Sequence, residues 1–179
     1  LQYGLAAREQ GAGLMLMSDC KYGYRGEGST LGLTLLNSST SPDPYPERGI
    51  HQFAIGLTAS ADHPAAAENK ATAFCHSIQY QSNSIHAGTL PPKKQLVTLD
   101  AENVVLSAVW MEGNELRVRL YETGGEESCG TLLLEDPAVR AEACDGLGQT
   151  ASGNAAITDG HVSFTIPPFQ LMELHITFA

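Results

Sequence analysis

Two strands joined by a tight turn decide the fold: Val104-Val-Leu-Ser-Ala-Val-Trp110, then Gly113-Asn114, then Glu115-Leu-Arg-Val-Arg-Leu-Tyr121. In the third of these stretches Leu and Val alternate with charged residues, which is typical of a strand with one face in a core. Gly and Asn are favoured in the short turns of β-hairpins. The first stretch is apolar on both faces except at Ser107, so we expect it to be a central strand.

The same two-residue period recurs along most of the chain, and turns rich in Gly, Asn and Asp separate the repeats. The alternating positions are Leu31, Leu33 and Leu35; His51, Phe53, Ile55 and Leu57; Val162, Phe164 and Ile166; and Leu174, Ile176 and Phe178. Strands at this spacing predict an all-β chain with an antiparallel β-sandwich.

Two segments interrupt the strand pattern. The stretch Pro64–Ala71 is short and lacks an apolar face, so we expect an irregular excursion or one loose turn there. The pair Pro91-Pro92 precedes a new run of strands, which predicts a boundary near residue 95. We therefore expect one region over residues 1–95 and a second over residues 96–179.

Charge and length exclude several classes of partner. The 179 residues carry a net charge of −10, and the ten Lys and Arg residues are scattered. A nucleic-acid partner requires a basic face, and an anionic membrane surface attracts basic segments, so neither partner is expected. The sequence also has no apolar run of about 18 residues, the minimum for a membrane-spanning helix.

The cysteines and histidines predict neither disulfides nor a metal site. Cys20, Cys75, Cys129 and Cys144 are too far apart for a C-x-x-C motif, and we expect four thiols in a reducing compartment, the cytoplasm of a bacterial-type cell. The six His residues do not follow metal-ligand spacings, so no metal ligand is expected in this chain.

Two polar loops are the densest clusters of reactive side chains. The segment Asp19–Tyr24 follows an apolar strand, and the Pro-rich segment Ser41–His51 follows another. Charged groups such as Asp43 and Arg48 can bind sugar hydroxyls while a Tyr ring stacks on a sugar. An ion-paired connection stiffened by proline explains the same composition. The residues alone thus indicate a β-sandwich module with a possible sugar site.

Several blocks resemble the C-terminal region of glycoside hydrolase family 38 α-mannosidases, and they occur in the same order. In the first half they are Asp19-Cys-Lys-Tyr-Gly-Tyr24, Leu31-Gly-Leu-Thr-Leu-Leu36, and Pro42-Asp-Pro44 with Arg48-Gly-Ile-His-Gln-Phe53. In the second half they are Asp100–Ser107, Arg119–Glu122 and Ile166–Phe169. The resemblance spans nearly the whole chain.

This resemblance implies a fragment that is not catalytic alone. Members of the family are retaining exo-α-mannosidases whose zinc ion and Asp nucleophile lie in an N-terminal α/β domain, so no cofactor is expected here. The implied fold is the end of a β super-sandwich, residues 1–95, followed by a small antiparallel β-sandwich, residues 96–179. The implied partners are the N-terminal catalytic domain of the same polypeptide and a mannose-containing oligosaccharide.

The resemblance also assigns substrate-proximal residues, because loops of this region help to close the sugar site of the family. Asn37 stands where many relatives carry Arg, whose forked donor Asn cannot reproduce. A stand-alone carbohydrate-binding β-sandwich is the alternative function, and a structural interaction module is a third. The residues expected near substrate are Asp19, Lys21, Tyr22, Tyr24, Asn37, Asp43, Arg48 and His51.

Overall fold

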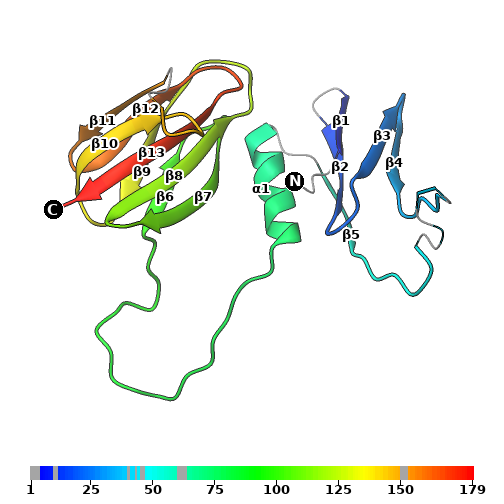
Figure 1. Ribbon diagram of the computed structural model, residues 1–179, viewed down its shortest axis with the longest axis horizontal. Helices are drawn as coiled ribbons and strands as arrows, with labels where there is room; N and C mark the ends of the chain where they lie inside the picture. The colour runs from blue at the N-terminus through cyan, green and yellow to red at the C-terminus, as the bar shows by residue number, and fades with distance from the viewer. Residues whose placement is uncertain are drawn as a thin grey trace. The chain divides into compact units, whose positions relative to one another are not determined.

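The computed structural model describes residues 5–9, 12–39, 41–42, 44, 47–59, 64–149 and 153–179. Strands in four antiparallel sheets, with a single helix, make up the regular structure of this described part, which confirms the all-β prediction (Figure 1). The chain divides into two compact units. The first unit is Leu1–Asp62 with Ala66–Tyr80, and the second is His63–Ala65 with Gln81–Ala179.

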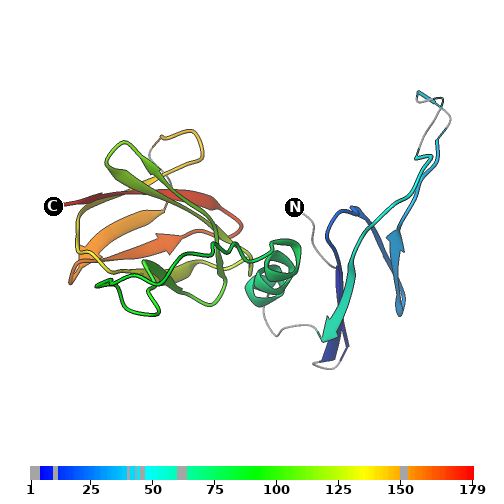
Figure 2. The same cartoon turned by 90° about the horizontal axis from the view of Figure 1, so that it is seen from below.

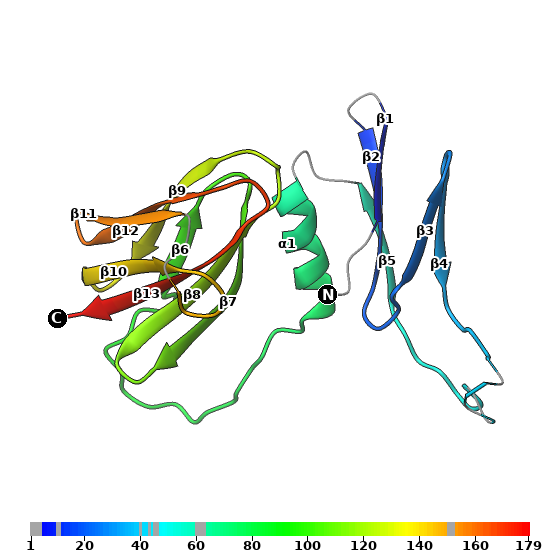
Figure 3. The same cartoon turned by 45° about the horizontal axis from the view of Figure 1, so that its top comes forward.

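The first unit contains a sheet with strand order β1-β2-β5, a separate hairpin β3-β4, and helix α1 (Figure 3). Met15 and Met17 on β2 pack against Ala71 of the helix, so α1 covers one face of the sheet. The bounds are β1 Leu5–Glu9, β2 Ala12–Ser18, β3 Gly23–Glu27, β4 Thr30–Thr34, β5 Ile55–Ala59 and α1 Pro64–Cys75.

Helix α1 corrects the prediction of a loose turn, since it is a 12-residue helix. Its core-facing positions Ala67, Ala71 and Phe74 are spaced as one helical face, but two of them are small, so the sequence pattern is faint. Alanine has the highest helix propensity, and the sheet supplies the burial that the isolated segment lacks. A Cβ on Gly56 would lie 2.9 Å from the Phe74 ring, so the helix packs closely on β5.

The second unit is a β-sandwich of two four-stranded sheets, ordered β10-β13-β8-β7 and β11-β12-β9-β6 (Figures 1 and 2). Its core lies between the sheets and includes Val118, Leu132, Phe164, Leu174 and Ile176, all buried. The bounds are β6 Val97–Asp100, β7 Val104–Glu112, β8 Glu115–Glu122, β9 Ser128–Leu134, β10 Ala138–Cys144, β11 Asn154–Thr158, β12 His161–Ile166 and β13 Leu171–Phe178.

The predicted hairpin is confirmed, but its first strand is not central. Strands β7 and β8 pair in antiparallel register from Val104 opposite Glu122 to Glu112 opposite Glu115. Strand β7 is the edge of its sheet, and the register shifts between Leu106 and Ala108. Such a bulge changes which side chains face the core, which explains a strand that is apolar on both faces without being central.

The strand predicted from His51 to Leu57 begins only at Ile55. The backbone N–H of Ala54 donates to the Asp19 carboxylate, at 2.9 Å, so a side chain takes up the donor just before the strand. The Leu-rich strand likewise ends at Thr34, and Leu35 is exposed beyond it. Within the described part of the chain, no helix is long and apolar enough to cross a bilayer.

Candidate functional site

The loop Asp19–Tyr24 joins β2 to β3 and is ordered by its own side chains. The Ser18 hydroxyl oxygen accepts the backbone N–H of Lys21 at 3.2 Å. The Asp19 carboxylate accepts the Ala54 N–H, and the Asp19 N–H donates to the Ala54 carbonyl at 3.3 Å. The Ala54 hydrogen bond, followed by one from the Cys20 thiol, lowers the pKa of Asp19. Asp19 is therefore an ionised group that fixes the loop on residues 52–54.

Lys21 strengthens the same connection. Its Nζ lies 5.3 Å from the centroid of the Phe53 ring, a cation–π distance. The Cys20 thiol lies 4.0 Å from the Gln52 carbonyl oxygen. The hydrogen bond to the Asp19 carboxylate raises the pKa of Cys20, so this thiol is neutral at pH 7. These contacts hold the first loop beside the end of the second.

Glu47 organises the second loop. Its carboxylate accepts the backbone N–H of Asn37 at 2.7 Å, and its carbonyl oxygen lies 2.7 Å from His51 Nε2. Glu47 also has a positive φ of 47°, which a non-glycine residue rarely adopts. The sequence places Glu47 among the charged groups of the polar second loop, but Glu47 is not in the set of residues expected near substrate.

The two loops share an open hollow of about 420 Å³ in the first unit. Of the residues predicted near substrate, Lys21, Tyr22 and Asn37 line it. The complete lining is Cys20, Lys21, Tyr22, Gly23, Thr34, Leu35, Leu36, Asn37 and Glu47. The structure therefore brings the two loops side by side, as expected from strands that follow one another in sequence.

The other predicted residues that the structure describes do not line this hollow. Tyr24 points its hydroxyl to a buried position where it makes no hydrogen bond, and burial raises the pKa of Tyr24. Arg48 and His51 are exposed, and the His51 ring is held by the Glu47 carbonyl. Asp43 lies outside the described residues.

The side chains that line the hollow include charged and amide groups. The Lys21 ammonium donates, the Glu47 carboxylate accepts, and the Asn37 amide does both. Among the described residues, no group of three or more His, Cys, Asp and Glu side chains could hold a metal ion. The lining therefore offers both donors and acceptors of hydrogen bonds.

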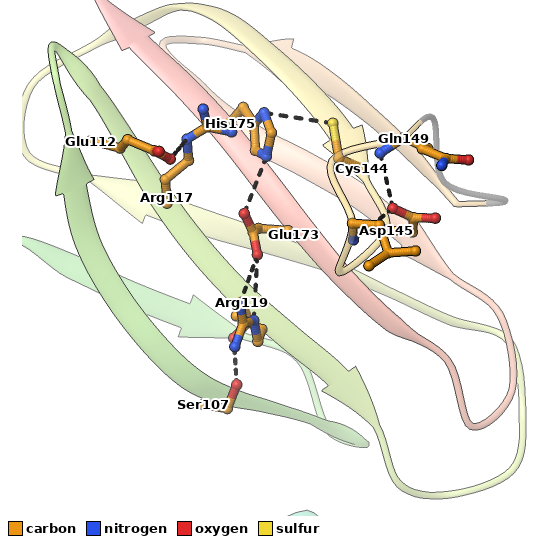
Figure 4. Close-up of polar contacts among 10 residues, drawn as sticks. Ser107, Glu112, Arg117, Arg119, Cys144, Asp145, Gln149, Glu173 and His175 are labelled. Carbon is orange, nitrogen blue, oxygen red and sulfur yellow. Dashed lines mark hydrogen bonds and ion pairs between the residues drawn. The ribbon is translucent and has the colours of Figure 1, made fainter.

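A second polar cluster lies on the outer face of the sandwich sheet that contains β8, β13 and β10 (Figure 4). Glu173 accepts from Arg119 at 3.0 Å and lies 3.2 Å from His175 Nε2. His175 Nδ1 lies 3.6 Å from the Cys144 sulfur. The order thiol, imidazole, carboxylate matches that of a nucleophile and its base. Burial, followed by the charge of Glu142, raises the pKa of the Cys144 thiol, which disfavours the thiolate that a nucleophile requires.

Glu122 is a buried carboxylate that sequence reasoning did not single out. It accepts backbone N–H groups from Gly124 at 2.6 Å, Gly125 at 2.8 Å and Phe169 at 2.9 Å. Burial alone would raise the pKa of Glu122, but these donors outweigh it, so the pKa lies below its usual value. Glu122 therefore joins the turns after β8 and β12, and Glu122 and Phe169 each belong to a block of the family resemblance.

Comparison with known proteins finds α-mannosidases, as the sequence blocks led us to expect. No protein-family model matches the chain. Human α-mannosidase 2C1 is 29% identical over 175 residues, which cover 93% of this chain. The α-mannosidase of Saccharomyces cerevisiae is 23% identical over an alignment of 199 residues that covers 95% of it. The resemblance to α-mannosidases is confirmed.

The likeness covers one part of those α-mannosidases. The chain spans 16% of the length of the human relative and 18% of the yeast relative. Dictyostelium discoideum α-mannosidase G is 26% identical over 148 residues, which are 75% of this chain and 13% of that relative. This chain is therefore related to a segment of α-mannosidases.

Proposed function

We propose that this chain is the C-terminal β region of a family 38 α-mannosidase, a retaining exo-glycosidase that hydrolyses terminal α-mannosides. In this proposal the chain supports and helps to close the sugar site and is not catalytic alone. The N-terminal catalytic domain of the same polypeptide and a mannose-containing oligosaccharide are its partners. The zinc ion belongs to that other domain, and we assign none of its ligands to this chain.

The main support for this proposal is the face of the β1-β2-β5 sheet that lies opposite helix α1. Helix α1 covers the face of Met15 and Met17, and side chains alternate along a strand, so Leu14, Ile55 and Leu57 lie on the other face. These three side chains are 45%, 47% and 66% exposed. A sheet that is apolar on both faces is normally an inner layer. Such a layer fits a piece of a longer β super-sandwich.

The hollow between the two loops supplies the proposed contribution to the sugar site. Lys21 and Asn37 bind sugar hydroxyls, and the Tyr22 ring stacks on the apolar face of a sugar. Asp19 acts indirectly, because its hydrogen bonds to Ala54 position the loop that carries Lys21. Glu47 holds Asn37 in the same way. The bond-breaking groups lie in the other domain.

The test compares two polypeptides, the longer gene product and this 179-residue chain, on an aryl α-mannoside. We expect turnover by the first and none by the second. In the longer protein, Asn37→Ala raises KM about 3–10-fold with kcat less affected, because one or two neutral hydrogen bonds to substrate are lost. The matched control is Asn114→Ala in the β7–β8 turn. An inactive longer product refutes the proposal.

A stand-alone carbohydrate-binding β-sandwich is the second candidate. It is favoured by the location of the hollow, which is complete within this chain. Titration of the isolated chain with a mannose trisaccharide, followed by NMR shifts at Lys21 and Asn37, distinguishes the candidates. Saturable binding by the isolated chain, with an inactive longer product, would favour the binding module.

The cytoplasm remains the proposed location. The four cysteines are thiols, as a reducing compartment would maintain them.

A further inference from the structure

The stretch between α1 and β6 exposes large apolar side chains. All of residues 76–96 are described, and none of them lies in a helix or a strand (Figure 1). Ile78, Tyr80 and Ile85 are 91%, 93% and 105% exposed. The side-chain hydrogen bonds of Asn83 and His86 are to near neighbours in sequence. The stretch is therefore held by few contacts of its own, yet it exposes three large apolar side chains to water.

The two ends of this stretch differ in composition. Residues 76–90 contain no Asp, Glu, Lys or Arg, although these types make up 17% of the chain. Within it, Ser77-Ile-Gln-Tyr-Gln81 alternates polar and apolar residues, which is typical of a half-buried strand. By contrast, Pro91-Pro-Lys-Lys94 is the stiff, charged composition of a spacer. Only the first part could be buried without removing an Asp, Glu, Lys or Arg side chain from water.

We propose that residues 76–90, here termed the strap, dock in an apolar groove on the part of the mannosidase polypeptide that lies outside this chain. This inference rests on the proposed function. Ile78, Tyr80 and Ile85 are its anchors, and the alternating sequence of 77–81 suits a strand added to a sheet edge. The spacer then leads to β6 of the sandwich.

Length and charge favour this partner over a second copy of the chain. The relatives contain far more polypeptide than this chain, which spans 16% of the human protein. A groove in the same polypeptide meets the strap at a high effective concentration. Two copies would each bring a net charge of −10, which opposes association.

The experiment measures backbone hydrogen exchange of residues 76–90 in the longer gene product and in the 179-residue chain. We expect exchange to be about tenfold slower, or more, in the longer protein, because docking buries the strap amides. Equal, fast exchange in both overturns the inference. Equal protection in both also overturns it, because the groove then lies within this chain. If protection of the strap in the 179-residue chain increases with protein concentration, and sedimentation shows a dimer, the groove belongs to a second copy instead.

A double variant tests the anchors. Replacing Ile78 and Tyr80 with Ser in the longer protein should restore fast exchange of the strap and accelerate its cleavage by a protease several-fold. Leu147→Ser is the matched control, since Leu147 is 83% exposed in a turn of the sandwich. Unchanged protection in the double variant overturns the anchoring role.

Activity on an aryl α-mannoside is measured on the same preparations. A protected strap in an inactive protein refutes the proposed function and leaves the docking intact. A fast-exchanging strap in an active protein refutes the docking alone.

Discussion

The two units of this chain differ in how completely they bury their own apolar side chains. In the sandwich, both sheets direct side chains such as Leu132 and Leu174 inward, and each is fully buried. In the first unit, α1 covers one face of the sheet and leaves Leu57 on the other face largely exposed. A sheet contributes most to stability when its apolar face is packed against another layer. The sandwich thus buries its apolar faces within itself, whereas among the described residues the first unit leaves one apolar sheet face largely exposed.

The largest expected effect tests the sandwich core against the open sheet. Phe164→Ala should destabilise the sandwich by about 3–5 kcal/mol, because Phe164 lies in the core and its removal leaves a cavity. Leu57→Ala should change the free energy of unfolding by about 0.5 kcal/mol or less, since the side chain already contacts water. Denaturant midpoints of the two variants measure both. Equal losses would mean that the face of Leu57 is packed in this chain.

The second prediction concerns the buried carboxylate of the sandwich. Glu122→Gln should cost about 1–3 kcal/mol, because one amide oxygen replaces an ionised group that accepts three backbone donors. Glu127→Gln, at an exposed position in the same turn, is the control and should be nearly neutral.

The ionised Glu122 carboxylate also leads us to expect that the free energy of unfolding decreases at acid pH. The pKa of Glu122 is lower in the folded protein than its usual value, so the unfolded chain takes up the proton first. Its contribution is complete above about pH 5 and is lost as the pH falls through the folded-state pKa. Urea midpoints between pH 7 and pH 3 should fall less steeply for Glu122→Gln than for the native sequence. Parallel curves would contradict the assignment.

The third prediction returns to the first unit, where close helix packing is the main source of burial. Gly56→Ala should destabilise this unit by about 1–3 kcal/mol, because the new Cβ would lie 2.8 Å from the Met17 side chain and 2.9 Å from the Phe74 ring. Gly88→Ala is the matched control, since nothing lies within 4 Å of a Cβ there. Loss of helical circular dichroism on heating reports the change. A neutral Gly56→Ala would show that α1 can shift away from the sheet.

The sequence predicted most of the sandwich because its strands follow a local rule. Alternation identified the strand containing Phe164, and the Gly113-Asn114 turn identified the β7–β8 hairpin. Helix α1 was missed because its core face is made largely of alanine and is completed by Met15 and Met17 of a distant strand. The edge position of β7 was missed because strand order depends on contacts that no local pattern contains.

The candidate site was predictable only in part, for the same reason. Lys21, Tyr22 and Asn37 line the hollow, and the family resemblance directed attention to them. Glu47 was seen as a charged group of the second loop, but its bond to Asn37 was not predicted, because the backbone donor lies ten residues away in a loop that periodicity does not describe. Glu122 was missed as well, since an acidic residue at a strand end gives no sign in the sequence that its partners are backbone N–H groups.

The smallest expected effects compare ion pairs in the two units. In the first unit, Arg25 and Glu27 are both 75% exposed, so Arg25→Ala should change stability by less than about 0.5 kcal/mol.

In the sandwich, Arg119 is 39% exposed and its partner Glu173 only 10%. Removing Arg119 leaves Glu173 with the His175 contact and also removes the stacking of the guanidinium 5.2 Å from the Trp110 ring centroid. Because water can reach the vacated position, we expect a loss of about 1 kcal/mol. Adding Glu173→Gln to the Arg119→Ala variant separates the lost ion pair from the lost Trp110 contact. If the second substitution restores most of the lost stability, the loss came from the unneutralised carboxylate. If it restores none, the loss came from the Trp110 contact. A loss well above 2 kcal/mol for Arg119→Ala would contradict the prediction and place Glu173 among the fully desolvated charges of the molecule.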